Sequence, residues 1–218
     1  MIVVGQFLRT DFPEIPYPQK MDTLQVFWCP KDHFFEYPND LEFVGPNVVL
    51  EWVSWKSLKD FKLPPLNPNF PPEVEYLVEP CTVSPEQIIE YPNLSELPVE
   101  IRDSVEDRLR EAGVEEYECE LSISSGWKIG GWASWHLTDF QSIECLDCGD
   151  AMALLLKADS SEWDGEGERW HPLEDRGLSE EEFENAYAPT KAVLGRHGEL
   201  RVFVCRANIQ HRIILNSQ

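Results

Sequence analysis

Four short apolar runs, rich in β-branched and aromatic residues, constrain the fold of this chain more than any other feature. They occupy residues 23–30, 47–55, 151–158 and 200–205. Such runs are typical of buried strands. No regular alternation of strand and helix patterns accompanies them, so a parallel β–α–β sheet is not expected. The pattern predicts an α+β fold with mixed or antiparallel sheets and a few peripheral helices.

The clearest helix pattern covers residues 99–112. Ile101, Val105 and Leu109 follow one another at intervals of four residues, which places them on one face of a helix. Gly113 stands where a helix C-cap belongs. The apolar stripe predicts that this helix packs against the rest of the molecule.

Weaker signals predict the remaining elements. Ser84 and Ser179 each begin a capping box, completed by a Gln or Glu three residues later, so a short helix is expected after each of them. Residues 116–124 alternate in the manner of a strand. Residues 63–76 contain five prolines, which remove hydrogen-bond donors and indicate an extended surface connection.

Two of the apolar runs resemble each other. The motif Leu-x-Val-Phe-x-Cys begins at Leu24 and again at Leu200, and each copy is followed by a histidine. This similarity suggests an internal pseudo-repeat with halves of approximately 1–100 and 101–218, folded as a single unit.

A formal net charge of −22 is the most informative feature of the composition. A surface this acidic repels phosphate backbones and anionic membranes, so no nucleic-acid or membrane partner is expected. It suits a basic protein partner, although acidic surfaces also serve solubility alone. The first residues lack the basic start of a signal peptide, and no apolar run is long enough to span a membrane. We therefore expect a cytoplasmic protein with reduced thiols.

The segment 126–137, GWKIGGWASWHL, combines a double glycine with clustered tryptophans. Gly130 and Gly131 permit a turn that other residues make only at a cost in free energy. Trp127, Trp132 and Trp135 have two interpretations. They form an aromatic cover over the turn, or they form a partner-binding surface, because binding hot spots are rich in tryptophan.

Cys145 and Cys148 have the spacing of a metal-binding pair and are followed by a glycine. A structural zinc needs two more ligands. Cys205 and Cys29, which stand near the ends of the two similar runs, are the first candidates, with His211 and His33 as substitutes. A redox pair and unremarkable core thiols are the alternatives.

Several of these motifs together resemble the YwqG-like proteins, a bacterial family of unknown function. The residues that carry the resemblance are Lys128, Gly130, Gly131, 154–156, 163–165 and 198–203. The resemblance covers about residues 120–205 and is looser before them. The chain departs from the family pattern at Ala133, where proline is common, and at Lys157, where glutamine is common. The family is in turn distantly similar to the programmed-cell-death-2-like proteins, which escort a small-subunit ribosomal protein.

Catalytic motifs are absent from the sequence: it has neither a Gly-x-Ser-x-Gly nucleophile turn, nor a His-Glu-x-x-His zinc helix, nor a phosphate-binding glycine loop. The sequence therefore favours an acidic binding protein, of the escort or immunity type, for a basic partner. The alternative is an enzyme whose site is assembled from residues without a recognisable spacing.

Overall fold

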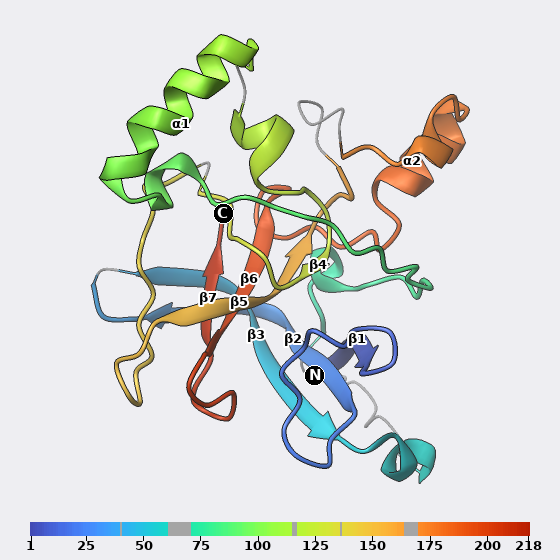
Figure 1. Ribbon diagram of the computed structural model, residues 1–218. Coiled ribbons are helices and arrows are strands. Elements are labelled where there is room, and N and C mark those ends of the chain that lie inside the picture. Colours follow the sequence, from blue (N-terminus) through green and yellow to red (C-terminus); the bar gives the residue numbers. More distant parts are fainter. Residues whose placement is uncertain (40, 61–70, 115–116, 136, 164–169) are drawn as a thin grey trace.

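Two antiparallel sheets form the frame of the protein (Figure 1). The computed structural model describes residues 1–39, 41–60, 71–114, 117–135, 137–163 and 170–218. The first sheet has the strand order β1-β2-β3, with β1 at Ile2–Leu8, β2 at Thr23–Glu36 and β3 at Glu42–Val53. The second has the order β4-β5-β6-β7, with β4 at Lys128–Ile129, β5 at Met152–Asp159, β6 at Glu199–Cys205 and β7 at Ile214–Ser217.

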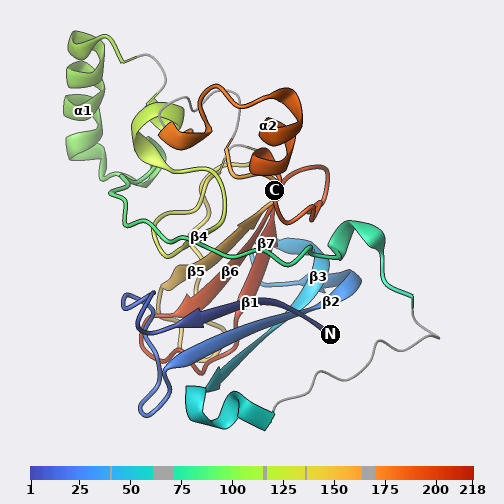
Figure 2. The same cartoon turned by 90° about the vertical axis from the view of Figure 1, so that its right-hand side faces the viewer.

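All four apolar runs are strands, and the α+β class expected from the sequence is confirmed. The main hydrophobic core takes residues from both sheets, among them Leu24 and Val26 of β2 and Leu200 and Val202 of β6, all at most 1% exposed. The sheets also adjoin where β3 meets β7, and Figure 2 shows the two sheets side by side. Packing between the sheets therefore buries the apolar runs, as their composition requires.

The two α-helices lie at one end of the molecule, beyond the second sheet (Figures 1 and 2). Helix α1 spans Val99–Ala112 and ends at Gly113, whose φ of 72° is the left-handed conformation of a C-cap. Helix α2 spans Glu180–Tyr187 and has both hydrogen bonds of the expected capping box at Ser179. The C-terminal cap of α1 and the N-terminal cap of α2 thus agree with the predictions from local sequence.

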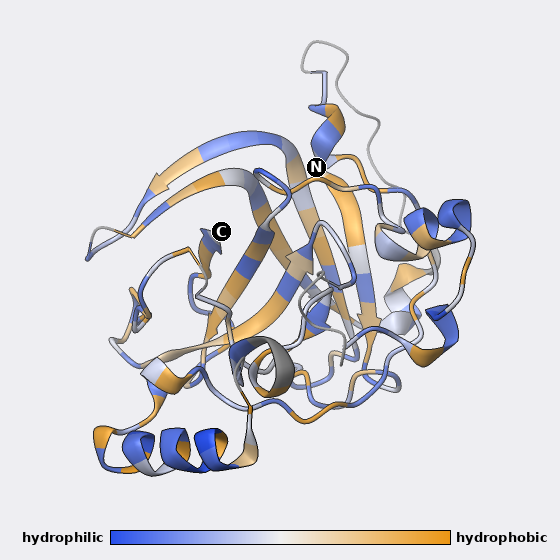
Figure 3. Ribbon diagram, turned by 90° about the horizontal axis from the view of Figure 1, so that it is seen from above, coloured by the Kyte–Doolittle hydropathy of each residue, from blue (hydrophilic) through white to orange (hydrophobic). Residues whose placement is uncertain are grey.

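The prediction that α1 packs through its apolar stripe is wrong in part. None of its residues is buried, Ile101 is 47% exposed, and Val105 and Leu109 are half-buried. Figure 3 shows the mostly hydrophilic helix standing at the periphery. At the N-terminal end of the helix, the Arg102 guanidinium donates to the carbonyl oxygens of Ser95 and Leu97.

Two other local predictions, the helix after Ser84 and the strand at residues 116–124, are wrong, and one physical reason accounts for both. Residues 84–91 form no helix, and the predicted strand at 116–124 contains a π-helical turn at Glu118–Ser122. The two segments bond to each other: the Tyr91 amide donates to the Ser122 carbonyl oxygen, and the Tyr117 hydroxyl donates to the Pro92 carbonyl oxygen. Tertiary hydrogen bonds therefore override the local signals in both segments.

Shorter 3-10 helices complete the described elements, at Trp55–Asp60, Val74–Tyr76, Leu94–Glu96 and Leu173–Asp175. No helix within the described ranges is long and apolar enough to cross a membrane. Residues 63–70 of the proline-rich connection, together with Asp164 and Gly165 of the family resemblance, lie outside the described residues.

Candidate functional site

Three cysteines and one histidine converge at one end of the second sheet. Cys145 and Cys148 belong to the turn before β5, Cys205 is the last residue of β6, and His211 lies in the loop between β6 and β7. Their ligand atoms all lie within 4.8 Å of one another. In Figure 1 the two loops descend side by side from the sheet. This group can hold a metal ion.

The geometry approaches that of a tetrahedral site. The Sγ atoms of Cys148 and Cys205 are 3.5 Å apart, as are Cys145 Sγ and His211 Nδ1. Ligands at about 2.3 Å from a tetrahedral zinc lie roughly 3.8 Å from one another. Only small side-chain movements would therefore be needed to place four ligands around one ion.

Hydrogen bonds between the two loops position these ligands. The Asp147 carboxylate accepts from the Arg212 backbone amide and from its guanidinium Nε, both at 2.7 Å. The Asp147 amide in turn donates to Cys145 Sγ at 3.5 Å. Gly149, with a φ of 77°, closes the turn, and its amide donates to the Cys145 carbonyl oxygen. The turn thus directs the Asp147 amide toward the Cys145 sulfur.

The thiols at this site differ in acidity. Burial raises the pKa of Cys205, but hydrogen bonds from the backbone of Asn208 and Ala207 and from Cys148 outweigh it and lower that pKa. A backbone hydrogen bond at Asp150 lowers the pKa of Cys148, yet desolvation and the two neighbouring thiols raise it to about 12. Thiols this close disfavour a second negative charge, which a bound cation would compensate.

Cys29 is not part of this group. It lies in β2 of the other sheet and is half-buried. The fourth member of the group is His211, one of the two substitutes considered from the sequence. The other substitute, His33, also lies in β2, where it stacks on Phe35. The similarity of the two runs does not bring Cys29 to the other three cysteines, because β2 and β6 belong to different sheets.

The three tryptophans are mostly covered by the protein itself. Trp135 is 8% exposed, and the Arg201 guanidinium lies 4.6 Å from its ring centroid. The half-buried Trp127 packs beside Trp28 and donates its indole N–H to the Asp159 carbonyl oxygen at 2.7 Å. Trp132 is also half-buried. The described contacts of Trp127 and Trp135 are thus with the rest of the protein.

One residue of the double glycine, Gly131, lies against the side chain of Glu90. Gly130 and Gly131 have φ values of 71° and 75°. A Cβ atom on Gly131 would stand 2.2 Å from Glu90 Oε2, whereas one on Gly130 would meet nothing within 4 Å. The Glu90 carboxylate accepts from the Trp132 amide at 3.1 Å and from Lys128 Nζ at 2.6 Å. The absent side chain at Gly131 thus makes room for a buried carboxylate.

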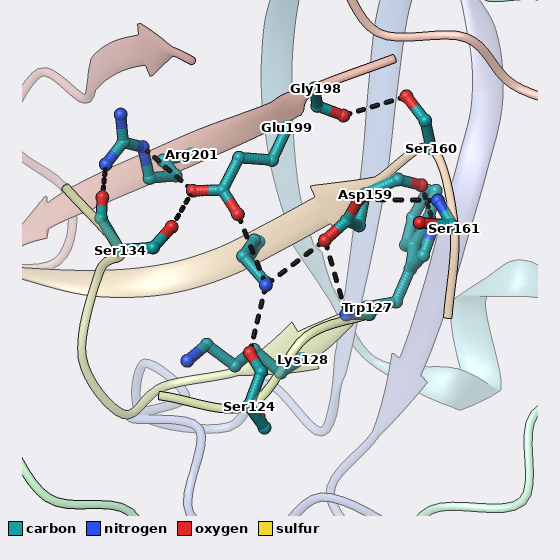
Figure 4. Close-up of polar contacts among 12 residues, drawn as sticks. Ser124, Trp127, Lys128, Ser134, Asp159, Ser160, Ser161, Gly198, Glu199 and Arg201 are labelled. Atoms are coloured by element: carbon teal, nitrogen blue, oxygen red, sulfur yellow. Dashed lines mark hydrogen bonds and ion pairs between the residues drawn. The ribbon is translucent and has the colours of Figure 1, made fainter. Parts of the chain in front are cut away.

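A buried ionic cluster lies between β5 and β6 (Figure 4). Lys157 Nζ is 3.2 Å from both Asp159 Oδ2 and Glu199 Oε2, and it donates to the Ser124 carbonyl oxygen at 3.0 Å. Arg201 Nε lies 3.4 Å from Glu199 Oε1. The side chains of Lys157, Glu199 and Arg201 are at most 5% exposed. Each buried charge of this cluster therefore has a partner of opposite sign.

The pKa values follow from burial and pairing. Burial opposes ionisation of Glu199, but Lys157 and Arg201 outweigh it and lower its pKa. Burial raises the pKa of Asp159 despite the neighbouring Lys157. In the adjoining Glu90–Lys128 pair, burial and repulsion from Lys157 lower the pKa of Lys128 to about 8. Attraction between opposite charges thus offsets part of the desolvation free energy that burial of these groups costs.

This cluster was not recognised from the sequence, although a signal exists. Lys157 and Asp159 are two residues apart, as are Glu199 and Arg201, so each pair lies on one face of its strand. Charges with this spacing inside apolar strands indicate a buried polar face. The antiparallel register then places Lys157 opposite Arg201 and Asp159 opposite Glu199, with unlike charges on the diagonals.

Two hollows flank the cysteine-histidine group. One of about 330 Å³ includes Cys145 in its wall, and one of about 660 Å³ includes Cys205. Neither contains a residue of the buried ionic cluster.

Comparison with family models, curated proteins and solved structures finds no match for this chain. The assignment of function therefore depends on the geometry of the molecule itself.

Proposed function

We propose that this protein is a zinc-stabilised binding module for a basic protein partner. The zinc assignment rests on the convergence of Cys145, Cys148, Cys205 and His211. Three thiolates and one imidazole are a ligand set that zinc prefers, and four protein ligands complete its tetrahedral shell. A complete shell has no open position for substrate, so we assign the ion a structural role that joins the turn before β5 to the loop after β6.

Elemental analysis of protein purified without added metal or chelator tests this assignment. We expect about one zinc per chain, and loss of the metal in Cys148→Ser. Cys81→Ser, which changes an exposed cysteine outside the group, is the matched control and should retain the metal. Metal-free wild-type protein, with these thiols titrating freely, contradicts the assignment.

The binding role rests on the distribution of charge. Lys128, Lys157 and Arg201 are buried with Glu90, Asp159 and Glu199 as partners. Equal numbers of opposite charges are thus enclosed, and the formal charge of −22 belongs to the rest of the chain. An acidic exterior of this kind attracts a basic partner and speeds association. We also propose that the chain is related to the YwqG-like family and that it is located in the cytoplasm.

Retention of proteins from lysate on the immobilised chain, at low and at high salt, tests the binding role. We expect a basic protein that is retained at low salt and released as salt screens the attraction. The purified candidate should then show a Kd that weakens with ionic strength. A specific partner that is acidic, or that binds equally well at both salt concentrations, contradicts the proposal. Turnover of a small molecule would favour the alternative of an enzyme.

A further inference from the structure

The distal part of the β2–β3 hairpin carries an exposed apolar pair. Phe34 lies opposite Val44, and their exposed fractions are 59% and 53%. In Figure 1 the hairpin end lies on the opposite side of the sheet from β1, which pairs with β2 only as far as Trp28. Figure 3 shows the two strands running out together toward this end. An apolar cross-strand pair on an extended arm is available for contact with another molecule.

Carboxylates surround this pair on the same face. Asp32, Glu36 and Glu42 are all exposed. Glu36 lies directly opposite Glu42, and like charges at facing positions destabilise a strand pair. No ion pair joins either glutamate to a cation in the described part of the chain. A cationic side chain placed between Glu36 and Glu42 would relieve this repulsion.

The backbone of the same stretch forms an open sheet edge. The Tyr37 amide donates to the Leu41 carbonyl oxygen, so these two residues form a hydrogen-bonded pair. Because such pairs alternate along antiparallel strands, the peptide groups of Phe34 and Glu36 point away from β3. Among the described residues, no strand pairs with this side of β2 beyond Trp28. In the same part of the chain, the segment around the 3-10 helix Val74–Tyr76 bonds to β2 only before Phe34: the Glu73 amide donates to the Pro30 carbonyl oxygen, and the Tyr76 hydroxyl donates to the Asp32 carboxylate. Open edges of this kind accept a further strand from a partner.

Resting on the proposed binding function, we infer that residues 32–36 of β2 form a docking edge for an extended basic segment of the partner. The segment pairs with the backbone of Phe34 and Glu36 as an added strand. On the face of Phe34, its side chains at every second position are in turn basic beside Glu36 and apolar beside Phe34. A second copy of this chain is the wrong occupant, because its own net charge of −22 would meet the same carboxylates.

The probe is a blocked ten-residue peptide in which every second residue is in turn lysine or valine and the intervening residues are threonine, so that lysine and valine lie on the same face of the added strand. Titrated into the ¹⁵N-labelled full chain, it should shift the amide signals of Phe34 and Glu36 and slow their hydrogen exchange. The double variant Glu36→Lys, Glu42→Lys should weaken binding by at least about tenfold, since each lost charge pair is worth on the order of 1 kcal/mol. Glu51→Lys, at an exposed position of β3 outside the arm, is the matched control and should change the Kd less than about threefold.

A second probe separates strand addition from nonspecific charge attraction. The same peptide with alternate backbone amides methylated keeps its charge but loses the hydrogen bonds of one edge, and we expect its binding to be lost. Equal affinity of the methylated peptide, shifts confined to other surfaces, or absence of binding at millimolar peptide overturns the docking edge. None of these outcomes tests whether the chain binds a basic partner, which the salt-dependent retention experiment tests separately. Failure of the docking edge can therefore be distinguished from failure of the proposed function.

Discussion

The carboxylate of Glu90 lies 2.6 Å from the ammonium group of Lys128, and both side chains are less than 10% exposed. Glu90 belongs to a segment without helix or strand, and Lys128 begins β4. The same carboxylate accepts from the amide and hydroxyl of Ser124 at 2.8 and 2.6 Å. One buried side chain therefore anchors the extended segment to the glycine turn.

Gly131→Ala should destabilise the protein more than Gly130→Ala. Both residues have a positive φ, which costs an alanine about 1–2 kcal/mol, but only at Gly131 does the new Cβ meet Glu90. We expect an additional loss of about 1–3 kcal/mol at Gly131, measured by urea unfolding. If the contact is responsible, the excess should shrink in a Glu90→Ala background. Equal costs at the two glycines would show that Glu90 moves away freely.

Glu199→Gln should be strongly destabilising, because it leaves Lys157 and Arg201 buried with one fewer counter-charge. The expected loss in the free energy of unfolding is about 3–5 kcal/mol. Asp107→Asn, which breaks the exposed pair with Arg110, should cost less than about 1 kcal/mol. Similar denaturation midpoints for the two variants would contradict the role of the ionic cluster.

Removal of the metal should lower the melting temperature by more than about 5 °C, because the ion would cross-link the turn before β5 to the end of β6 and the loop that follows it. Thermal melts with and without a chelator measure the difference. Cys205→Ser should melt like chelated wild type, and Cys29→Ser, outside the ligand group, should keep the chelator response. A melting temperature that is indifferent to chelator rules out a stabilising metal.

Glu96 should make stability fall as the pH rises. Burial, with a smaller effect from Glu118, raises the pKa of Glu96 from 4.5 to about 7. The folded state then binds more protons than the unfolded state between these values, so the stabilisation is complete below about pH 4.5 and is lost by about pH 7. Glu96→Gln should therefore gain about 1 kcal/mol relative to wild type at pH 8, after allowance for solvent screening.

Urea midpoints of wild type and Glu96→Gln at pH 5.5 and pH 8 test this effect. The difference between the two proteins should grow with pH. Glu86→Gln, at an exposed position, is the control and should follow wild type at both values. A difference that is constant with pH would assign the gain to something other than the ionisation of Glu96.

Leu109→Ala should be a mild change, unlike a substitution in the core. Leu109 is half-buried on α1, so the expected cost is about 1 kcal/mol rather than the 2–5 kcal/mol of a fully buried leucine. Leu200→Ala, at a position 1% exposed, should cost the full amount. A large loss at Leu109 would show that α1 is covered in solution.

Elements whose signals are local can be predicted from the amino-acid sequence. The strands that contain Leu24 and Leu200 follow from continuous apolar runs, because only burial satisfies such runs. The C-cap at Gly113 and the capping box at Ser179 depend on residues within one helical turn. The pairing of Cys145 with Cys148 belongs to the same class, since two intervening residues are enough to bring both thiols to one ion.

Which distant groups meet depends on the tertiary structure. It brings His211 rather than Cys29 to the three cysteines, since the end of β6 and its following loop adjoin Cys145 whereas β2 lies in another sheet. It turned residues 84–91 into an extended chain, because Glu90 gains Lys128 as a partner there. These outcomes depend on free energies of contacts between residues far apart in the chain, which a local pattern does not contain.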